Sequence, residues 1–235
     1  METRPYQQRL ITKAIDKFKA STNSIMIEAP TGSGKSCVGL SIAKQLQDEF
    51  NIGIGWIAMR RQLLNQIHVE NEKLNIGVQD LTTISMFQTT IPTVDAAGRP
   101  IQLLINDECQ HSPTASNTNI LNTIKPRWML GLSATGYRCD RLMLGYSSTL
   151  HDAGIHQLIS QGYLSPYHQY TIDKWNVDTV VSTFLNDPSR WGKSAIYWHR
   201  RENAIECARR LNEAGIKTAT IFGDEPWGTR EEKLE

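Results

Sequence analysis

Short apolar runs alternate with amphipathic stretches along the first two thirds of the chain. The apolar runs end abruptly in glycine or polar residues, which predicts strands at residues 25–27, 54–59, 101–105 and 128–132, and a short strand and turn at residues 81–87. Apolar positions at helical spacing predict helices at residues 37–49, 60–74, 120–124 and 155–159. Alternating strands and helices are typical of an α/β fold, so we expect a largely parallel sheet with helices on both faces.

The pattern restarts after Ser165-Pro166, which predicts a domain boundary at that point. We therefore expect one domain at residues 1–164 and a second at residues 165–235. In the second, the pattern predicts strands at residues 167–172, 194–198 and 216–222, and helices at residues 177–185 and 202–214. Two or three strands in about 70 residues make a poor independent core, so we expect this domain to be incomplete.

The most informative segment joins the first predicted strand to the first predicted helix. It reads APTGSGKS from Ala29 to Ser36, and a strand, a glycine-rich turn and a helix start are the context of a phosphate-binding loop. Glycines in the turn allow positive φ, so that consecutive amides can converge on phosphate oxygens at the positive end of the helix. The lysine adds a charge for the β- and γ-phosphates, and the serine hydroxyl can ligate Mg²⁺. The residues expected to bind the triphosphate are Pro30, Thr31, Gly32, Ser33, Gly34, Lys35 and Ser36.

An acidic pair, Asp107-Glu108, follows a buried apolar run about 70 residues further along. Asp107 is positioned to hold Mg²⁺ together with Ser36, and Glu108 to polarise an attacking water. Acidic residues are also common in solvated turns at strand ends, so the pair alone is a weak signal. Its distance from the phosphate loop, and the later strand that ends in Ser133-Ala134-Thr135, favour the catalytic interpretation.

Composition limits the remaining possibilities. The chain has 235 residues, 40% of them hydrophobic, and a formal net charge of +1, so a nucleic-acid partner would have to be held by local basic patches. No run approaches the roughly 18 apolar residues of a membrane span, and the polar N-terminus is unlike a secretory signal. Four widely spaced cysteines argue against a zinc site and a disulfide framework. We expect a cytoplasmic protein with no membrane partner.

Together these motifs resemble the N-terminal half of a superfamily 2 helicase of the DEAD/DEAH-box type. Motif I corresponds to APTGSGKS, motif II to DECQ at residues 107–110, and motif III to SAT at residues 133–135. The segment RPYQ at residues 4–7 resembles the upstream adenine-recognition element. GLSATGYRCDRL followed by LISQGYLSP is similar to the RadD-like and type III restriction-subunit branches, and residues 195–224 resemble motif IV and the start of a second RecA-like domain.

The resemblance implies a P-loop NTPase with a RecA-like ATP-binding domain, followed by part of a second one. It implies ATP and Mg²⁺ as cofactors and nucleic acid as partner. DNA is favoured over RNA, but the sequence leaves the choice between them open. Its implied site residues fall into four groups. They are Lys35, Glu108 and Gln110 for catalysis, Arg4 and Gln7 for the nucleotide, Ser133 and Thr135 for coupling, and Arg60, Arg61, Thr82, Thr83 and His199 for nucleic acid. For this last group, ordinary surface solvation is the open alternative.

Several positions depart from the family pattern. Ala29 replaces the first glycine of motif I, and Gly136 replaces the proline after SAT. Gln110 stands where DEAH-type proteins carry His, and an amide can still donate and accept hydrogen bonds; a shift of this role to His111 is the alternative. Motifs V and VI, the second of which supplies an arginine finger, do not occur in the 235 residues.

Three functions follow from this pattern. The first is an ATP-dependent helicase or translocase, weak in isolation. The second is a module that binds ATP and nucleic acid without hydrolysis, or half of a split motor whose second chain supplies motifs V and VI. The third is the translocating subunit of a restriction system, which rests on analogy alone.

Overall fold

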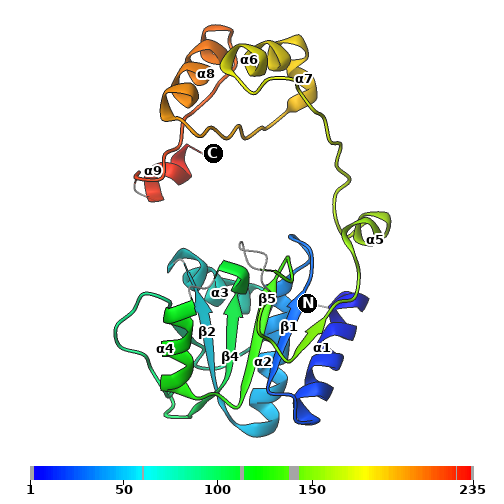
Figure 1. The fold of residues 1–235 in the computed structure, drawn as a ribbon, viewed down its shortest axis with the longest axis vertical. Helices are drawn as coiled ribbons and strands as arrows, with labels where there is room; N and C mark the ends of the chain where they lie inside the picture. Colours follow the sequence, from blue (N-terminus) through cyan, green and yellow to red (C-terminus); the bar gives the residue numbers. More distant parts are fainter. Residues whose placement is uncertain (1–2, 60, 112–113, 138–142, 226, 234–235) are drawn as a thin grey trace. The chain divides into compact units, whose positions relative to one another are not determined.

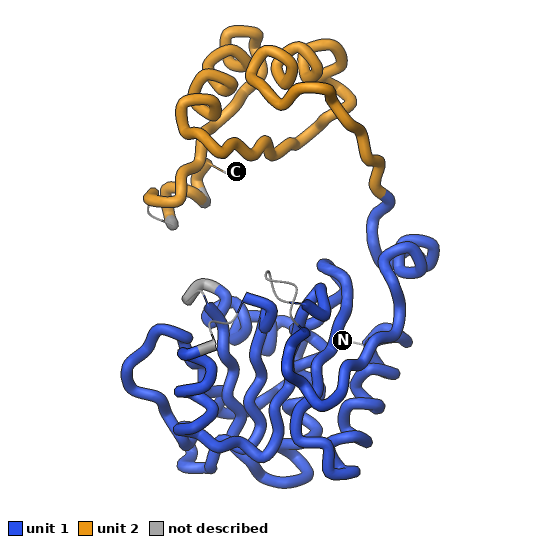
Figure 2. Tube along the Cα trace, in the orientation of Figure 1, with its two compact units in different colours: residues 1–166 blue, residues 167–235 orange. Residues whose placement is uncertain are grey.

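The computed structural model describes residues 3–59, 61–111, 114–137, 143–225 and 227–233. The chain divides into two compact units, residues 1–166 and residues 167–235 (Figure 2). The division falls close to the predicted boundary after residue 164, and the assignment of the two parts as RecA-like domains stays a prediction.

The first unit is an α/β unit with one parallel sheet (Figure 1). Its elements are α1 (Pro5–Lys19), β1 (Ser24–Glu28), α2 (Lys35–Phe50), β2 (Gly53–Ala58), α3 (Arg61–Lys73), β3 (Thr82–Ser85), β4 (Ile101–Asp107), the short 3₁₀ helix η1 (Cys109–His111), α4 (Thr114–Ile124), β5 (Trp128–Ser133), β6 (Ser148–Leu150) and α5 (Ile155–Ser160). The predicted parallel α/β architecture is confirmed.

The strand order places the motif-bearing strands side by side. The order is β3-β2-β4-β5-β1-β6, and every neighbouring pair is parallel. The registers pair Glu28 with Ser133 and Asp107 with Leu132. The carboxyl ends of β1, β5 and β4 therefore lie together at one edge of the sheet, the edge where ligands bind in open parallel sheets.

Helices cover both faces of the sheet, as predicted. On one face, α1, α2 and α3 pack through residues such as Leu10, Leu40 and Ile67 against Trp56 and other strand residues. On the other face, α4 packs through Ile120 and Ile124 in a smaller cluster. Strands β2 and β4 contribute to both clusters, because successive side chains of a strand point to opposite faces of the sheet.

Besides the short η1, two elements of the first unit lie outside the predicted set. No helix is predicted before residue 24, yet α1 forms, with Pro5 at its first turn and an apolar stripe that includes Leu10, Ala14 and Phe18. The three-residue strand β6 is too short to give a pattern of its own, and it forms by pairing with β1.

The second unit contains helices α6 (Val177–Asn186), α7 (Pro188–Trp191), α8 (Arg201–Glu213) and α9 (Trp227–Glu232). The two predicted helices are confirmed, but the three predicted strands are wrong, because the described residues of those segments form no strand. Among the described residues of this unit, Val180, Val181, Cys207 and Leu211 form one small buried cluster. The apolar side chains of the expected strands instead pack, partly buried, around α6 and α8, and no neighbouring strand satisfies their backbone groups.

Candidate nucleotide-binding site

The phosphate loop leaves the end of β1 and enters α2, as the sequence predicts. Gly32 and Gly34 have φ of 79° and 80°, the left-handed region that favours glycine, and Gly34 is the N-cap of α2. Lys35 is the first residue of the helix and only 9% exposed. Its ammonium donates to the carbonyl of Ala29 at 3.4 Å, across the base of the loop.

Two side chains of α1 form hydrogen bonds to the backbone of the phosphate loop. The Tyr6 hydroxyl donates to the Ser33 carbonyl at 2.6 Å, and Gln7 Nε2 donates to the same oxygen at 2.9 Å. Gln7 Oε1 in turn accepts a hydrogen bond from the backbone N–H of Arg4 at 2.9 Å. Gln7 therefore braces the loop; its predicted contact with a base stays a prediction. Sequence reasoning missed Tyr6, although it lies inside the RPYQ motif.

The loop leaves little room for side chains in place of its glycines. A Cβ at Gly34 would lie 2.5 Å from Gln7 Nε2, and one at Gly32 would lie 3.1 Å from Leu164 Cδ2. The Ser33 hydroxyl is buried without a hydrogen-bond partner among the described residues. A loop with positive-φ glycines, a buried lysine and an orphaned hydroxyl fits a bound anion.

The segment LISQGYLSP closes one side of this loop. The Tyr163 ring packs against Tyr6, with ring centroids 5.5 Å apart, and the Arg4 guanidinium lies 5.2 Å from the centre of the Tyr163 ring. Leu164 contacts the loop at Gly32. This segment therefore links the end of the first unit to the RPYQ segment at the start of α1.

The acidic pair lies at the end of β4, two strands away from the loop in the sheet order. Burial and the neighbouring Glu108 raise the pKa of Asp107 to about 6, and the Glu108 N–H and Lys35 oppose this shift. That N–H donates to Asp107 Oδ1 at 3.0 Å. Glu108 itself has φ of 49°, a conformation that residues with a side chain rarely adopt, so the turn after β4 is strained.

A hydrogen-bonded series connects motif II to motif III. Gln110 Nε2 donates to Glu108 Oε2 at 2.6 Å, and the Ser133 hydroxyl lies 2.6 Å from Gln110 Oε1. The same hydroxyl lies 2.6 Å from the Thr135 carbonyl and accepts the Thr135 N–H at 3.0 Å. A hydroxyl has one proton, so Gln110 and Thr135 compete for it.

Tyr146 contacts motif II through Cys109, and sequence reasoning missed this residue. Its buried hydroxyl shares hydrogen bonds with the side chains of Cys109 and Asn106, and burial raises the pKa of Tyr146. A Cβ at Gly131 would lie 2.4 Å from Tyr146 Cζ, so the ring depends on a glycine in β5. No strand or helix pattern surrounds Tyr146, which is why the sequence gives no signal for it.

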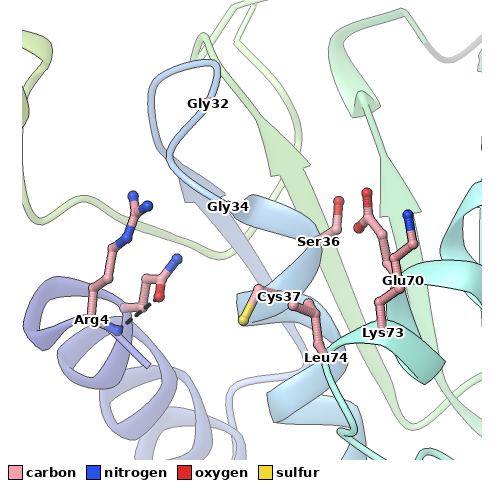
Figure 3. A pocket seen from close by; sticks show the side chains of 9 residues that line it. Arg4, Gly32, Gly34, Ser36, Cys37, Glu70, Lys73 and Leu74 are labelled. Carbon is pink, nitrogen blue, oxygen red and sulfur yellow. Dashed lines mark hydrogen bonds between the residues drawn. The ribbon is translucent and has the colours of Figure 1, made fainter. Parts of the chain in front are cut away.

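A pocket of about 280 Å³ borders the phosphate loop (Figure 3). Its lining residues come from the start of α1, the loop and the end of α3: Arg4, Gln7, Gly32, Gly34, Ser36, Cys37, Glu70, Lys73 and Leu74. Sequence reasoning assigned no role to the three residues from the α3 end, because nothing in the pattern shows that this end reaches the loop.

The residues predicted to contact nucleic acid are not brought into this site. Arg60 lies outside the described residues, and Arg61 begins α3. Thr82 and Thr83 lie in the first half of the edge strand β3, away from its carboxyl end. His199 is exposed and belongs to the second unit. Their roles stay predictions.

The oxygen ligands near the phosphate loop fit a Mg²⁺ ion bound together with substrate phosphates, rather than a metal ion bound by protein side chains alone. Ser36 and Asp107 offer the hard oxygen ligands that Mg²⁺ takes alongside substrate phosphates. Within the part of the chain that the structure describes, no group of three or more His, Cys, Asp or Glu residues is arranged to hold a metal ion. Among the same residues, no helix is long and apolar enough to cross a membrane. Cytoplasmic residence stays a prediction.

Comparisons with known proteins agree with the motifs. Residues 1–90 match the family described as type III restriction enzyme, res subunit. IRC3 of Saccharomyces cerevisiae, a protein assigned to the ATP-dependent helicases, is 25% identical over 253 aligned positions. These positions cover 94% of this chain and 37% of IRC3, so the chain spans little more than a third of that relative.

Solved structures share the fold. The nuclease-deletion mutant of the type ISP restriction-modification enzyme LlaGI, in complex with a DNA substrate mimic, matches with a TM-score of 0.52 and 14% identity, over 100% of this chain and 31% of its own. The UvsW helicase from bacteriophage T4 matches with a TM-score of 0.50 and 15% identity. The match covers 64% of this chain and 60% of the UvsW chain. The Hef helicase domain of Pyrococcus furiosus matches with a TM-score of 0.50 and 14% identity. The match covers 91% of this chain and 53% of the Hef chain.

The parallel sheet and its phosphate loop have the RecA-like fold, which is the fold of the helicases that match. The family match and the relative then confirm the expected resemblance. The chain is similar to superfamily 2 helicases, and its first 90 residues resemble type III restriction subunits.

Proposed function

We propose that this chain is the ATP-binding part of a nucleic-acid motor, which hydrolyses ATP with Mg²⁺ to move along nucleic acid or to unwind it. The observation that supports this most strongly is the series from Glu108 through Gln110 to Ser133, next to the phosphate loop. A site that only bound a nucleotide would not need hydrogen bonds that connect a carboxylate acting as general base, Glu108, to a neighbouring strand.

The proposed roles follow from position. The amides of residues 31–36 hold the phosphates, and the Lys35 ammonium neutralises their charge. Ser36 and Asp107 would hold Mg²⁺, which when bound stabilises negative charge on the β- and γ-phosphates. One Glu108 oxygen accepts a hydrogen bond from Gln110, and the carboxylate orients the attacking water and takes its proton. When Glu108 takes the proton, its hydrogen bond to Gln110 changes. That change would pass through Gln110 to Ser133 and Thr135 in motif III.

DNA is the partner we propose. One structural neighbour was solved with a DNA substrate mimic, and the matched family is a restriction-enzyme subunit. Contacts by Arg60, Arg61, Thr82, Thr83 and His199 belong to this proposal, and so does a second RecA-like domain in residues 165–235. Phosphate contacts would make such binding independent of sequence and sensitive to salt.

The test is ATP turnover by the purified chain, alone and with single-stranded DNA, double-stranded DNA or RNA. We expect turnover that rises with DNA. Binding of MgATP without turnover under every condition would favour a non-hydrolysing module or half of a split motor. Failure to bind MgATP would contradict the proposal altogether.

A further inference from the structure

The carboxylate of Glu70 lines the same pocket as the first residues of the helix that follows the phosphate loop. Glu70 lies near the end of α3, and Figure 3 shows its carboxylate beside the Ser36 hydroxyl, across the loop from Arg4. It is the one carboxylate among the residues that line this pocket. An acidic side chain therefore lies at the phosphate end of the candidate nucleotide site.

No protein cation neutralises this carboxylate within the part of the chain that the structure describes. Lys73 lies three residues further along α3 and lines the same pocket, but the two side chains form no ion pair. Glu70 Oε1 accepts a hydrogen bond from Gln66 Nε2 at 3.0 Å, one turn earlier in α3. Among the described residues, the second oxygen, Oε2, has no partner.

The charge of Glu70 also acts on the end of β4. Burial is the largest cause of the raised pKa of Asp107, and the negative charge of Glu70 adds to it. Oxygen-bearing side chains from three elements, Ser36 of α2, Asp107 of β4 and Glu70 of α3, therefore border the place where the phosphates would sit.

Carboxylates beside bound phosphates weaken nucleotide binding by repulsion, unless a cation lies between the two kinds of group. Mg²⁺ meets this need, since it binds to phosphates and to one or two carboxylates while it keeps several water molecules. The described residues contain no group of three or more His, Cys, Asp or Glu arranged to bind a metal ion directly. This favours a role for Glu70 through the water around the ion over direct contact with the ion.

We propose that Glu70 is a further carboxylate for the Mg²⁺ ion of the bound nucleotide, and that it accepts hydrogen bonds from water molecules on that ion. The proposal rests on the proposed function and adds α3 to the elements of the metal site. Side chains in this indirect position strengthen metal binding by about tenfold to a hundredfold. Glu70 should therefore have two effects of opposite sign, because it attracts the ion but repels a nucleotide that carries no ion.

The experiment measures binding of the imido analogue of ATP, which is not hydrolysed, by calorimetry in Mg²⁺ and in EDTA. Mg²⁺ should strengthen binding to the wild-type chain. In Glu70→Ala this gain should fall about tenfold to a hundredfold, while binding in EDTA should be unchanged or tighter. Glu70→Gln keeps the shape of the side chain without its charge, and it should lose most of the gain. The EPR signal of Mn²⁺, used in place of Mg²⁺, reports metal binding directly and should show the same loss of affinity.

Glu72→Ala is the matched control. Glu72 lies on the same helix, is exposed and does not line the pocket, so this variant removes the same charge from α3. It should keep the wild-type gain from Mg²⁺.

Three results would overturn the inference and leave nucleotide binding by the loop standing. One is an unchanged gain from Mg²⁺ in Glu70→Ala, or no gain in the wild type. Another is an equal loss in Mg²⁺ and in EDTA, which would indicate a structural role for Glu70. The third is a similar loss in Glu72→Ala, which would indicate a general effect of charge. Failure of the wild type to bind the analogue in Mg²⁺ would overturn both the inference and the proposed function.

Discussion

Gln110 donates its amide to Glu108 at 2.6 Å, and thereby fixes the carboxylate that we assign to water activation. The opposite end of the same amide lies 2.6 Å from the Ser133 hydroxyl. A glutamine at the fourth position of motif II therefore keeps motifs II and III connected, where DEAH-type relatives carry a histidine.

The first prediction concerns this amide. Gln110→Ala should lower the rate of ATP hydrolysis about tenfold to a hundredfold, the effect of losing a hydrogen bond to a charged group, while MgATP affinity changes little. Steady-state kinetics with DNA present measure both quantities. Gln110→His should restore much of the rate. Equal rates in the wild type and Gln110→Ala would show that the connection does not matter.

The second prediction concerns the buried lysine of the loop. Lys35→Ala should weaken MgATP binding roughly a hundredfold, because the phosphates lose a desolvated positive charge. Lys44→Ala is the control, since Lys44 lies on the same helix but pairs with Asp48 and lines no part of the pocket. Calorimetry should show wild-type affinity for Lys44→Ala. Similar losses in both variants would contradict the assignment of Lys35.

The third prediction separates backbone strain from the shape of the loop. Gly34 and Gly98 have φ of 80° and 77°, so alanine at either position should cost about 1–2 kcal/mol of stability in urea unfolding. A Cβ at Gly98 meets nothing within 4 Å, whereas one at Gly34 would collide with Gln7. Only Gly34→Ala should therefore also lose nucleotide binding. Wild-type binding by Gly34→Ala would contradict the role given to Gln7 in bracing the loop.

The fourth prediction concerns pH. The pKa of Asp107 is about 6 in the folded chain, against about 3.9 in an unfolded chain. The folded state therefore holds a proton that the unfolded state has lost between these values, and stability falls as pH rises through this window. Above pH 6 the buried charge should cost roughly 3 kcal/mol.

Asp107→Asn removes this charge, so it should be more stable than the wild type at pH 8 and similar to it at pH 4. Urea unfolding at the two pH values measures the difference. The variant should also lose Mg²⁺-dependent nucleotide binding, and wild-type binding should weaken as pH falls through 6. Equal stability of both chains at pH 8 would show that Asp107 carries no such penalty.

Much of the fold and the phosphate loop could be predicted because their signals are local. The strand before Ala29, the glycines at positions 32 and 34 and the helix after Lys35 are encoded within a dozen residues. The strand ends at Asp107 and Ser133 could be placed beside the loop because parallel strands share one carboxyl edge.

The missed features depend on contacts between distant parts of the chain. Tyr146 reaches Cys109 through the tertiary fold, and the end of α3 lines the pocket beside the loop together with residues more than 30 positions earlier in the chain. The strands predicted in the second unit failed for a related reason. Apolar runs such as residues 194–198 are compatible with a strand, but a strand forms only where a neighbour satisfies its backbone.

The most direct test measures binding and phosphate release on the same samples, for the wild type and Glu108→Gln, with MgATP and DNA. If Glu108 activates the water, both chains bind MgATP with similar affinity, and only the wild type releases phosphate, faster with DNA than without. Phosphate release by Glu108→Gln at the wild-type rate, or a wild-type chain that does not bind MgATP, would contradict the account.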